Sequence, residues 1–449
     1  MAGTILQSTS ANIGSSVGNG MAMNTATNVL YTINPTNKTC TVINVANGTV
    51  VTTINLATTP AYIAVNSTTN TIYINSNSAT CIVINGANNT IIANVTLPGN
   101  GGQMGINATT NNVYIIGPTS SVYVLNGANN TVTTTTVYAS ATTYYGNGQG
   151  MVVDATTNKV YIAYANAGGT AVYLCVIVGN AYSTFATIST TAATDVFLSV
   201  NLIPGSTYAF VSYMESTGSL VTIKGVNTGT YSVSSALTGA ELGTGSGSTY
   251  HYGSLSNTTS GFHYIRTQVG IVVVSGSSLL ATGFIIPTSV NGLCVINPGT
   301  NTMYYQNGTS VYTIDLSTTL SYGPFTIPSS INAFMVTSKN VLCLLNNNVV
   351  NLLYFSEIAQ LVSNLATVSA NSFGNKVQFG TGVTNASYTA IIYYPTPYVN
   401  TPVVVPVAVG SGLGVSITAY YNTYFTVTSW NDSGGQVATV TFDWIAIGT

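Results

Sequence analysis

Charged residues are scarce in this chain. Its 449 residues contain six Lys or Arg, eight Asp or Glu and two His, so 3% are charged, compared with about 25% in ordinary soluble proteins. The six basic residues are scattered and form no positive stripe, which argues against a nucleic-acid partner held through its phosphates. Catalysis needs acids, bases or nucleophiles brought together, and the few carboxylates lie in different parts of the sequence. We therefore expect a protein that is not an enzyme.

Long apolar stretches are also lacking. No run of 18 apolar residues occurs, so no segment is expected to span a membrane as a helix. The start, Met-Ala-Gly-Thr-Ile-Leu-Gln-Ser, has neither the basic nor the apolar region of a secretory signal. A chain whose signal had been removed would look the same.

Uncharged polar residues must supply the solvated surface instead. Thr, Asn, Ser, Gly and Tyr are abundant, and a surface of hydroxyls and amides changes its solvation little with pH or salt. We therefore expect the melting temperature to vary little between about pH 3 and pH 8. Such a surface suits an extracellular or virion-surface setting, reached by lysis where no export signal is present. Drift of composition in a repeat array is the alternative explanation.

The five cysteines cannot all pair. Each lies inside an apolar run, where a free thiol acts as a small hydrophobic group. Cys40 and Cys81 occupy equivalent positions of two successive repeats, and such positions are usually too far apart for a disulfide. We therefore expect buried free thiols at Cys40, Cys81, Cys175, Cys294 and Cys343.

A unit of about 41 residues recurs along the chain, and periods of this length made of short strands are typical of propellers and arrays. One copy holds Ala61-Tyr-Ile-Ala-Val-Asn66, Thr71-Ile-Tyr-Ile-Asn75 and Cys81-Ile-Val-Ile-Asn85. Each run alternates apolar with polar residues, which predicts β-strands about 5 residues long. The sequence thus predicts an all-β fold.

We predict a β-propeller of eight blades, with seven as the alternative, over residues 1–355. The first strand of each repeat should line the central channel, where ends such as Asp154 would lie. The last repeat lacks a fourth strand, and residues 4–9 have the spacing of an outer strand. We expect residues 4–9 to pair with 349–355 and close the ring, which removes exposed strand edges. The eight first strands are expected at 20–24, 61–66, 102–107, 150–154, 196–201, 250–256, 291–297 and 331–337.

A different composition follows the repeats. Residues 356–374 read as a linker with a short helix over 356–368, where Ser356 is placed as an N-cap and apolar residues recur at helical spacing; this is either a packed linker or a helix on a trimer axis. Residues 375–449 read as a small antiparallel β-sandwich. Its strands are expected at 376–379, 401–407, 415–419, 424–427 and 440–448.

One hairpin tip of this sandwich is the candidate ligand site. Trp430, Asn431 and Asp432 precede a Gly-Gly turn, and an exposed Trp beside amide and carboxylate groups can stack on a sugar ring while the polar groups bind its hydroxyls. The alternative is that Trp430 packs inward.

His251 and His263 fall on neighbouring strands and are the one local pair that could begin a metal site. No third ligand is evident within reach, so we predict no metal and no cofactor.

The repeats resemble the YVTN-type β-propeller repeats of bacterial and archaeal surface-layer and secreted proteins. The resemblance rests on Asn70-Thr-Ile-Tyr-Ile-Asn75 with Ile84-Asn-Gly-Ala-Asn-Asn-Thr-Ile-Ile92, and on Asn111-Asn-Val-Tyr-Ile115 with Leu125-Asn-Gly-Ala-Asn-Asn-Thr-Val132. It implies a propeller in a cell-surface setting.

The last 75 or so residues, with their Trp-Ile-Ala-Ile-Gly tail, are similar to H-type lectin domains and to the C-terminal modules of phage tail fibres. This resemblance implies a lectin-like homotrimer that binds sugars or the cell surface. A trimer would also cover aromatic side chains that a lone sandwich exposes; these are Tyr393, Tyr394, Tyr420 and Tyr421.

Together these features predict a non-enzymatic virion surface protein, a tail-fibre or spike subunit, for host attachment. Its expected partners are a host cell-surface glycan or surface-layer protein, two further copies of itself and other virion proteins. A cellular surface-layer or adhesion propeller of an archaeon or bacterium is the alternative, and a propeller enzyme is the third hypothesis.

Overall fold

The computed structural model divides the chain into two compact units, Met1–Ser356 and Glu357–Thr449. All described secondary structure is β-strand, and no described helix is long and apolar enough to cross a membrane. The expected helix over 356–368 lies outside the described residues. These are 5–12, 20–76, 78–118, 121–136, 150–165, 171–179, 181–189, 199–203, 206–215, 220–237, 251–267, 270–278, 280–286, 292–319, 321–326, 331, 333–337, 341–346, 349–355, 376–394, 399–408, 413–431 and 435–448.

The described residues of the first unit form eight antiparallel sheets, numbered here 1 to 8 in chain order. Sheets 1 to 4 are β2 (Gly20–Asn24), β3 (Val29–Asn34), β4 (Thr39–Asn44), β5 (Thr49–Asn55); β6 (Pro60–Asn66), β7 (Thr71–Ser76), β8 (Thr80–Asn85), β9 (Thr90–Thr96); β10 (Met104–Asn107), β11 (Asn112–Ile116), β12 (Ser121–Asn126), β13 (Thr131–Thr136); and β14 (Met151–Asp154), β15 (Lys159–Ala165), β16 (Val172–Val178), β17 (Ala181–Ser189). Sheets 5 to 8 are β18 (Ser199–Leu202), β19 (Tyr208–Glu215), β20 (Leu220–Asn227); β21 (His251–Asn257), β22 (Phe262–Thr267), β23 (Gly270–Ser275), β24 (Ala281–Ile286); β25 (Cys294–Asn297), β26 (Thr302–Asn307), β27 (Ser310–Asp315), β28 (Ser321–Thr326); and β29 (Ala333–Val336), β30 (Val341–Asn346), β31 (Val349–Phe355), β1 (Ile5–Asn12).

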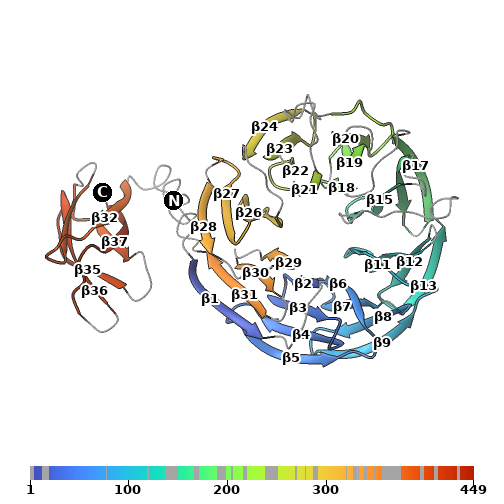
Figure 1. Cartoon of the computed structure of the whole chain (residues 1–449), viewed down its shortest axis with the longest axis horizontal. Helices are drawn as coiled ribbons and strands as arrows, with labels where there is room; N and C mark the ends of the chain where they lie inside the picture. The colour runs from blue at the N-terminus through green and yellow to red at the C-terminus, as the bar shows by residue number, and fades with distance from the viewer. Residues whose placement is uncertain are drawn as a thin grey trace. The chain divides into compact units, whose positions relative to one another are not determined.

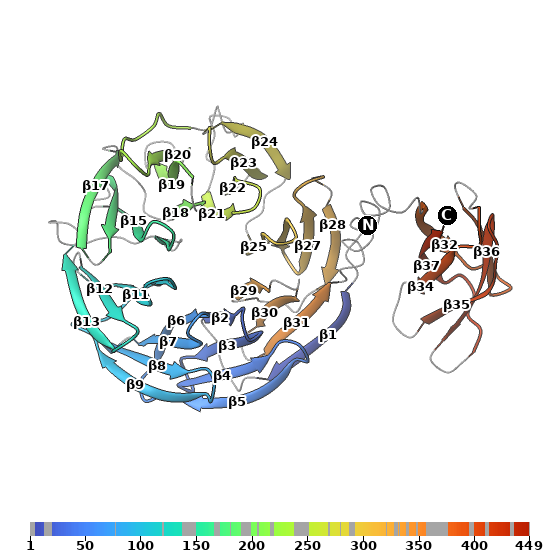
Figure 2. The same cartoon turned by 180° about the vertical axis from the view of Figure 1, so that it is seen from behind.

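The eight sheets follow one another around a central opening (Figure 1), and the view from behind shows the same order (Figure 2). The first strand of each sheet contacts the first strand of the next, from β2 through β6, β10, β14, β18, β21 and β25 to β29, and β29 contacts β2 again. Apolar clusters fill the space between adjacent sheets. Between sheets 1 and 8, for example, Leu30 and Ile43 pack with Cys343 and Leu352, all fully buried. Both faces of each sheet therefore contribute to the core.

The N-terminal strand completes sheet 8. Strand β1 pairs antiparallel with β31, from Ile5 opposite Phe355 to Asn12 opposite Val349. The spacing argument expected residues 4–9 to pair here, and the observed strand runs three residues further. Sheet 5 has three strands, and two isolated bridges, Ile223 to Leu237 and Val226 to Val233, continue it where the other sheets have a fourth.

Tyrosine belongs to the core of the first unit. The second strand of six sheets carries a Tyr at an equivalent position, and the side chain is buried in every case. The hydroxyl of Tyr114 donates to the carbonyl of Gly179 on the next sheet at 2.6 Å, and burial raises the pKa of Tyr73 to about 12. The expectation that Tyr contributes to the solvated surface is therefore wrong for the tyrosines at this position. The six buried tyrosines are Tyr31, Tyr73, Tyr114, Tyr161, Tyr264 and Tyr304.

The cysteines are free thiols as predicted, and burial holds for four of the five. All five cysteines are free, and four of them are buried while Cys294 is half-buried. Burial raises the pKa of Cys40 and of Cys81 to about 12. They serve as small core residues.

Side-chain amides join neighbouring sheets. The first strand of several sheets ends in an Asn, whose Oδ1 accepts hydrogen bonds from the following turn; Asn66, for example, accepts from Thr68 N at 3.0 Å. The Nδ2 of the same Asn donates to the Oδ1 of an Asn on the next sheet that has left-handed backbone geometry, which Asn tolerates well. We call these four bonds the amide links. They run from Asn24 to Asn70 at 2.6 Å, Asn66 to Asn111 at 2.8 Å, Asn107 to Asn158 at 2.8 Å and Asn257 to Asn301 at 2.6 Å.

Replacing Asn66 with Asp should isolate the contribution of one amide link. The carboxylate keeps the size and the turn acceptor but cannot donate to Asn111, and it places a charge at a site that is 1% exposed. We expect a loss of about 2 to 4 kcal/mol of stability at pH 7, measured by thermal unfolding. Asp154→Asn is the matched control, because Asp154 occupies the same position in sheet 4 and bonds Thr157 within its own turn at 2.6 Å. Equal effects of the two changes would contradict the interpretation.

The second unit packs two three-stranded sheets face to face. One contains β32 (Lys376–Val383), β37 (Thr441–Gly448) and β34 (Val403–Ala408), and the other β33 (Thr389–Tyr393), β36 (Tyr424–Asn431) and β35 (Leu413–Tyr420). Phe425 and Trp444 meet edge to face at 5.3 Å between ring centroids in the shared core. The sequence predicted five of these six strands and missed β33.

Candidate functional site

The predicted site lies at the end of β36, and the structure describes two of its three residues. Trp430 is 40% exposed. Its indole lies against Gly414 on β35, where even a Cβ would collide with the ring. Asn431 closes the turn, because both its backbone N–H and its Oδ1 bond the backbone of Gly435 at 2.9 Å. Asp432 lies outside the described residues. Trp430 is therefore neither fully packed inward nor free of the sheet, and one face of the indole is covered.

A group of tyrosines at the opposite end of β36 was only partly anticipated. Tyr393 ends β33, Tyr424 begins β36, and Tyr421 lies in the turn between β35 and β36. The ring centroids of Tyr393 and Tyr424 are 5.5 Å apart, and those of Tyr421 and Tyr424 are 4.6 Å apart. Tyr393 is 70% exposed and Tyr421 47%. We call Tyr393, Tyr421 and Tyr424 the tyrosine cluster. No pattern in the sequence indicated that Tyr424 belongs to it.

Tyr394 has a different role from its neighbour. It is buried and packs against Phe425 at 5.7 Å and Trp444 at 5.9 Å between ring centroids. The expectation that Tyr394 is exposed in a lone sandwich is therefore wrong, because successive residues at the end of a strand face opposite sides of the sheet. Tyr420 is 55% exposed, as expected.

The sheet that carries both aromatic sites bears no charge. From Val377 to Asn431 the sequence contains no Asp, Glu, Lys, Arg or His. Hydroxyls occupy the outer face between the two ends of β36, and Thr418 and Thr426 hydrogen-bond each other there at 2.8 Å. Such a face can offer aromatic rings and neutral hydrogen-bonding groups to a ligand.

The histidines do not form a pair. The register places His251 opposite Thr267 and His263 opposite Ser256. His263 is buried; its Nδ1 lies 2.7 Å from the Ser256 hydroxyl, and its ring lies 3.8 Å from that of Phe210 on the neighbouring sheet. Burial lowers its pKa to about 3. Among the described residues no group of three His, Cys, Asp or Glu could hold a metal ion.

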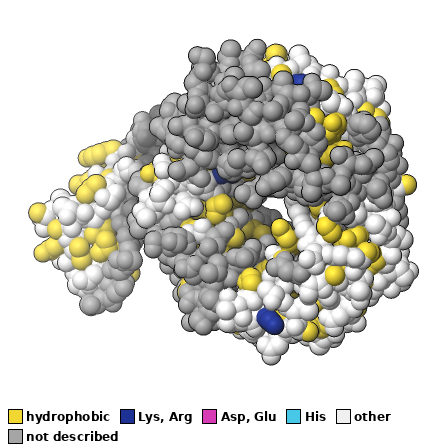
Figure 3. Space-filling view, turned by 45° about the vertical axis from the view of Figure 1, so that its right-hand side comes forward, with side chains coloured by type: hydrophobic (Ala, Val, Ile, Leu, Met, Phe, Trp, Pro, Cys, Tyr) yellow, Lys and Arg dark blue, Asp and Glu magenta, His cyan; other side chains and the backbone are white. Residues whose placement is uncertain are grey.

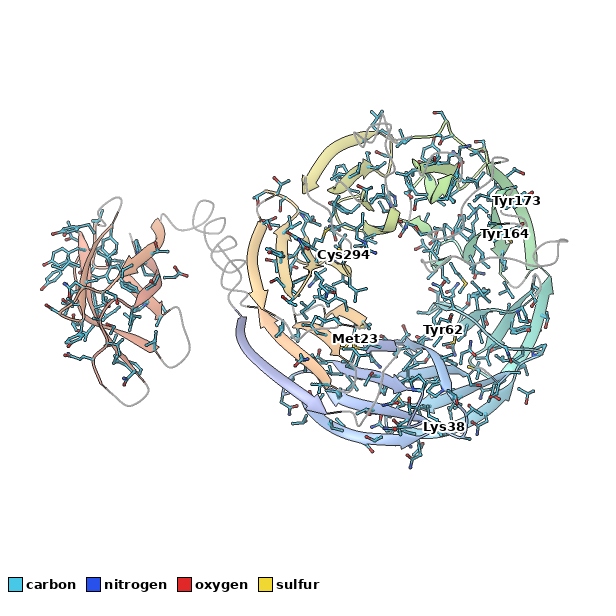
Figure 4. The ribbon with its side chains drawn as sticks, in the orientation of Figure 1. Met23, Lys38, Tyr62, Tyr164, Tyr173 and Cys294 are labelled. Carbon is cyan, nitrogen blue, oxygen red and sulfur yellow. The ribbon has the colours of Figure 1, made fainter. Side chains whose placement is uncertain are left out.

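Asp154 does not serve the central opening. It is 3% exposed and accepts hydrogen bonds from Thr156 N and from the backbone and hydroxyl of Thr157. The side chains drawn beside the opening include Met23, Tyr62 and Cys294 (Figure 4), and Tyr62 is 45% exposed. The space-filling view shows hydrophobic side chains around a central hollow and Lys or Arg in a few separate spots (Figure 3). The three side chains labelled beside the opening are apolar or aromatic.

Comparisons with known proteins bear on the fold of the first unit. No family model matches the chain, and no curated protein matches it. The structure is similar to the solved Dos1 propeller, with a TM-score of 0.56 and 10% identity over 77% of this chain and 93% of that chain. The first unit is a β-propeller. Hydrazine synthase from Kuenenia stuttgartiensis also matches, with a TM-score of 0.48 and 10% identity over 71% of this chain and 98% of that chain.

Proposed function

We propose that this protein is a non-enzymatic virion surface subunit, of the tail-fibre or spike type, that attaches the particle to a host-cell surface. The observation that carries the proposal is the charge-free aromatic and hydroxyl face of the second unit, next in the chain to a propeller. An exposed face of this kind suits recognition of an uncharged surface such as a host glycan. The hydroxyl of Ser256 lies 2.7 Å from His263 Nδ1, but burial lowers the pKa of His263 to about 3, which makes it a poor general base near neutral pH.

The propeller acts as a scaffold in this proposal. Its eight sheets are eight blades of one closed ring, of the YVTN type, and β1 closes the ring as the outer strand of the last blade. The pairing of β1 with β31 and the contact of β29 with β2 support closure. The amide links join four pairs of neighbouring blades, 1 to 2, 2 to 3, 3 to 4 and 6 to 7, through hydrogen bonds between uncharged groups.

Localisation on particles tests the proposal. Antibodies against the protein should label the outside of purified virions, and the protein should be found by mass spectrometry in particles banded on a density gradient. A cellular surface-layer or adhesion protein is the second candidate, favoured by the resemblance of the repeats to those of surface-layer proteins. Labelling confined to the cell envelope, with none on particles, would support that candidate and reject the first.

We further propose that the lectin-like second unit associates as a homotrimer through the sheet opposite the tyrosine cluster. Its outer face exposes valines: Val403 is 69% exposed, Val383 55% and Val405 50%. Val403 and Val405 are neighbours on β34, Val383 lies on the same face at the far strand β32, and the register places Asp443 between them. Exposed apolar side chains gathered on one face indicate an interaction surface. Three copies around one axis would cover it and present several copies of a weak ligand site together.

The mass in solution is the direct test of this association. By light scattering at micromolar concentration we expect three times the chain mass of 46.4 kDa. Val403→Asp with Val405→Asp should give the monomer mass, because the charges would be buried without partners. Ile391→Asp, a control on the other sheet at 58% exposure, should leave the trimer intact. A monomeric natural chain would reject the association, and a monomeric Ile391→Asp variant would reject this choice of surface.

A further inference from the structure

The tyrosine cluster is held in place by the backbone and the core beneath it. Tyr421 N–H donates to Tyr424 O at 2.8 Å, and Tyr394 N–H donates to Thr423 O at 3.0 Å, so the turn is tied both to itself and to the end of β33. The residues that follow Tyr393 and Tyr424 in sequence, Tyr394 and Phe425, are anchors in the core. The backbone that carries the rings is therefore fixed before any ligand arrives, which lowers the conformational entropy lost on binding.

The rings of the cluster, exposed at Tyr393 and Tyr421 and half-buried at Tyr424, present both apolar surface and hydroxyls. Tyr393, Tyr421 and Tyr424 pack as tilted pairs, so they form one continuous aromatic surface and not a slot between parallel rings. The exposed turn residues Asn422 and Thr423 border it and add amide and hydroxyl groups. A ligand that fits has one apolar face for the rings and several hydroxyls at its edge.

Charge decides the class of ligand. Anionic sugars and acidic or basic peptides are recognised by opposite charges, and all three strands of this sheet lie within the stretch from Val377 to Asn431 that has none. A pyranose whose axial hydrogens lie on one side meets both requirements without charge. A protein partner would ordinarily gain specificity from a charged rim, which this face cannot supply.

We propose that the tyrosine cluster is the saccharide-binding site of the second unit, and that it takes neutral hexopyranose residues, of the galactose or glucose type, by stacking. This rests on the proposed attachment function and names its ligand class. The site is distinct from Trp430, which lies six residues further along β36, roughly 20 Å at the rise of a strand.

Ligand-detected NMR on the full chain tests the site, with methyl β-galactopyranoside and methyl β-glucopyranoside as probes. Saturation should transfer from the protein to the axial ring hydrogens of at least one probe. Tyr393→Ala with Tyr421→Ala should weaken binding at least about tenfold, whereas Tyr421→Phe, which keeps the ring, should retain most of it. Tyr62→Ala, at an exposed tyrosine of the propeller, is the control expected to bind as the natural chain does. Trp430→Ala measures separately any binding at the other end of β36.

Different results of this experiment would overturn different parts of the proposal. Undiminished binding by the double variant together with loss in Trp430→Ala would overturn the tyrosine site but leave glycan attachment standing. Binding of sialylated or sulfated saccharides alone would overturn the neutral ligand class. If antibodies against the protein label virions and the full chain adheres to host cells but binds no saccharide, the glycan ligand is wrong while the attachment function holds. If the antibodies do not label virions and the chain does not adhere to host cells, the function itself is wrong.

Discussion

Removing residues 1–12 should lower the melting temperature of the propeller by about 10 °C or more, or cause aggregation. The deletion takes away β1 and with it every backbone hydrogen bond between β1 and the outer edge of β31. Strand β31 is apolar and part of the core, with Val350 and Leu352 fully buried. Its freed edge would then be available to pair with other molecules.

A peptide supplies the control for this deletion. A synthetic peptide of residues 1–12, added in excess, should restore the melting temperature by pairing with β31, and a scrambled peptide of the same composition should not. Calorimetry and light scattering report the two effects separately. An unchanged melting temperature with no aggregation would show that β1 does not contribute to closure of the ring.

Acid should destabilise the propeller below about pH 6.5, and His263 is the reason. Burial between Ser256 and the ring of Phe210 lowers its pKa from 6.5 to about 3. Between pH 3 and pH 6.5 the unfolded chain therefore binds a proton at this histidine that the folded chain does not. The free energy of unfolding is highest above pH 6.5 and falls as the pH drops. The loss reaches about 5 kcal/mol near pH 3. This revises the flat pH profile expected from composition.

Melting curves at pH 7 and pH 4 measure the effect. We expect the melting temperature of the natural chain to be roughly 5 to 10 °C lower at pH 4 than at pH 7. The substitution His263→Phe should remove most of that difference. Asp315 contributes in the same direction only at lower pH: burial acts to raise its pKa, but hydrogen bonds from Ser317 and Thr318 outweigh this and lower it. His251→Asn is the matched control. A pH response that persists in His263→Phe and disappears in His251→Asn would assign it to the other histidine.

The sequence predicted the strands of the propeller well because each repeat carries its own signal. Period-2 alternation closed by Asn or Gly marks a strand locally, and even the pairing of residues near 5 with those near 355 followed from spacing. Strand β33 was missed because Thr389-Ala-Ile-Ile-Tyr393 has adjacent apolar residues that blur the alternation. Which of its faces is covered depends on packing against the other sheet.

The candidate site was harder to predict, since it depends on contacts between distant segments. The exposure of Trp430 is set by Gly414 across the sheet, and the tyrosine cluster forms because Tyr393 opposes Tyr424 in the register. His263 is hidden for a related reason: both faces of a propeller sheet are covered by its neighbours, so alternation along β22 cannot tell an exposed side chain from a buried one.

The pairing of β1 with β31 also determines when during translation the first strand can fold. The two strands are about 340 residues apart in sequence, and at about 5 to 20 residues per second β1 waits roughly 20 to 70 s on the ribosome before its partner emerges. A strand left unpaired for so long is a hazard if it is apolar. The run Gln7-Ser-Thr-Ser10 in its middle suits that delay, because polar residues remain solvated until the last blade arrives. Strand β1 can pair with β31 only after nearly all of the first unit has been made. A prematurely terminated product would therefore keep an unpaired strand by which proteases and chaperones can recognise it.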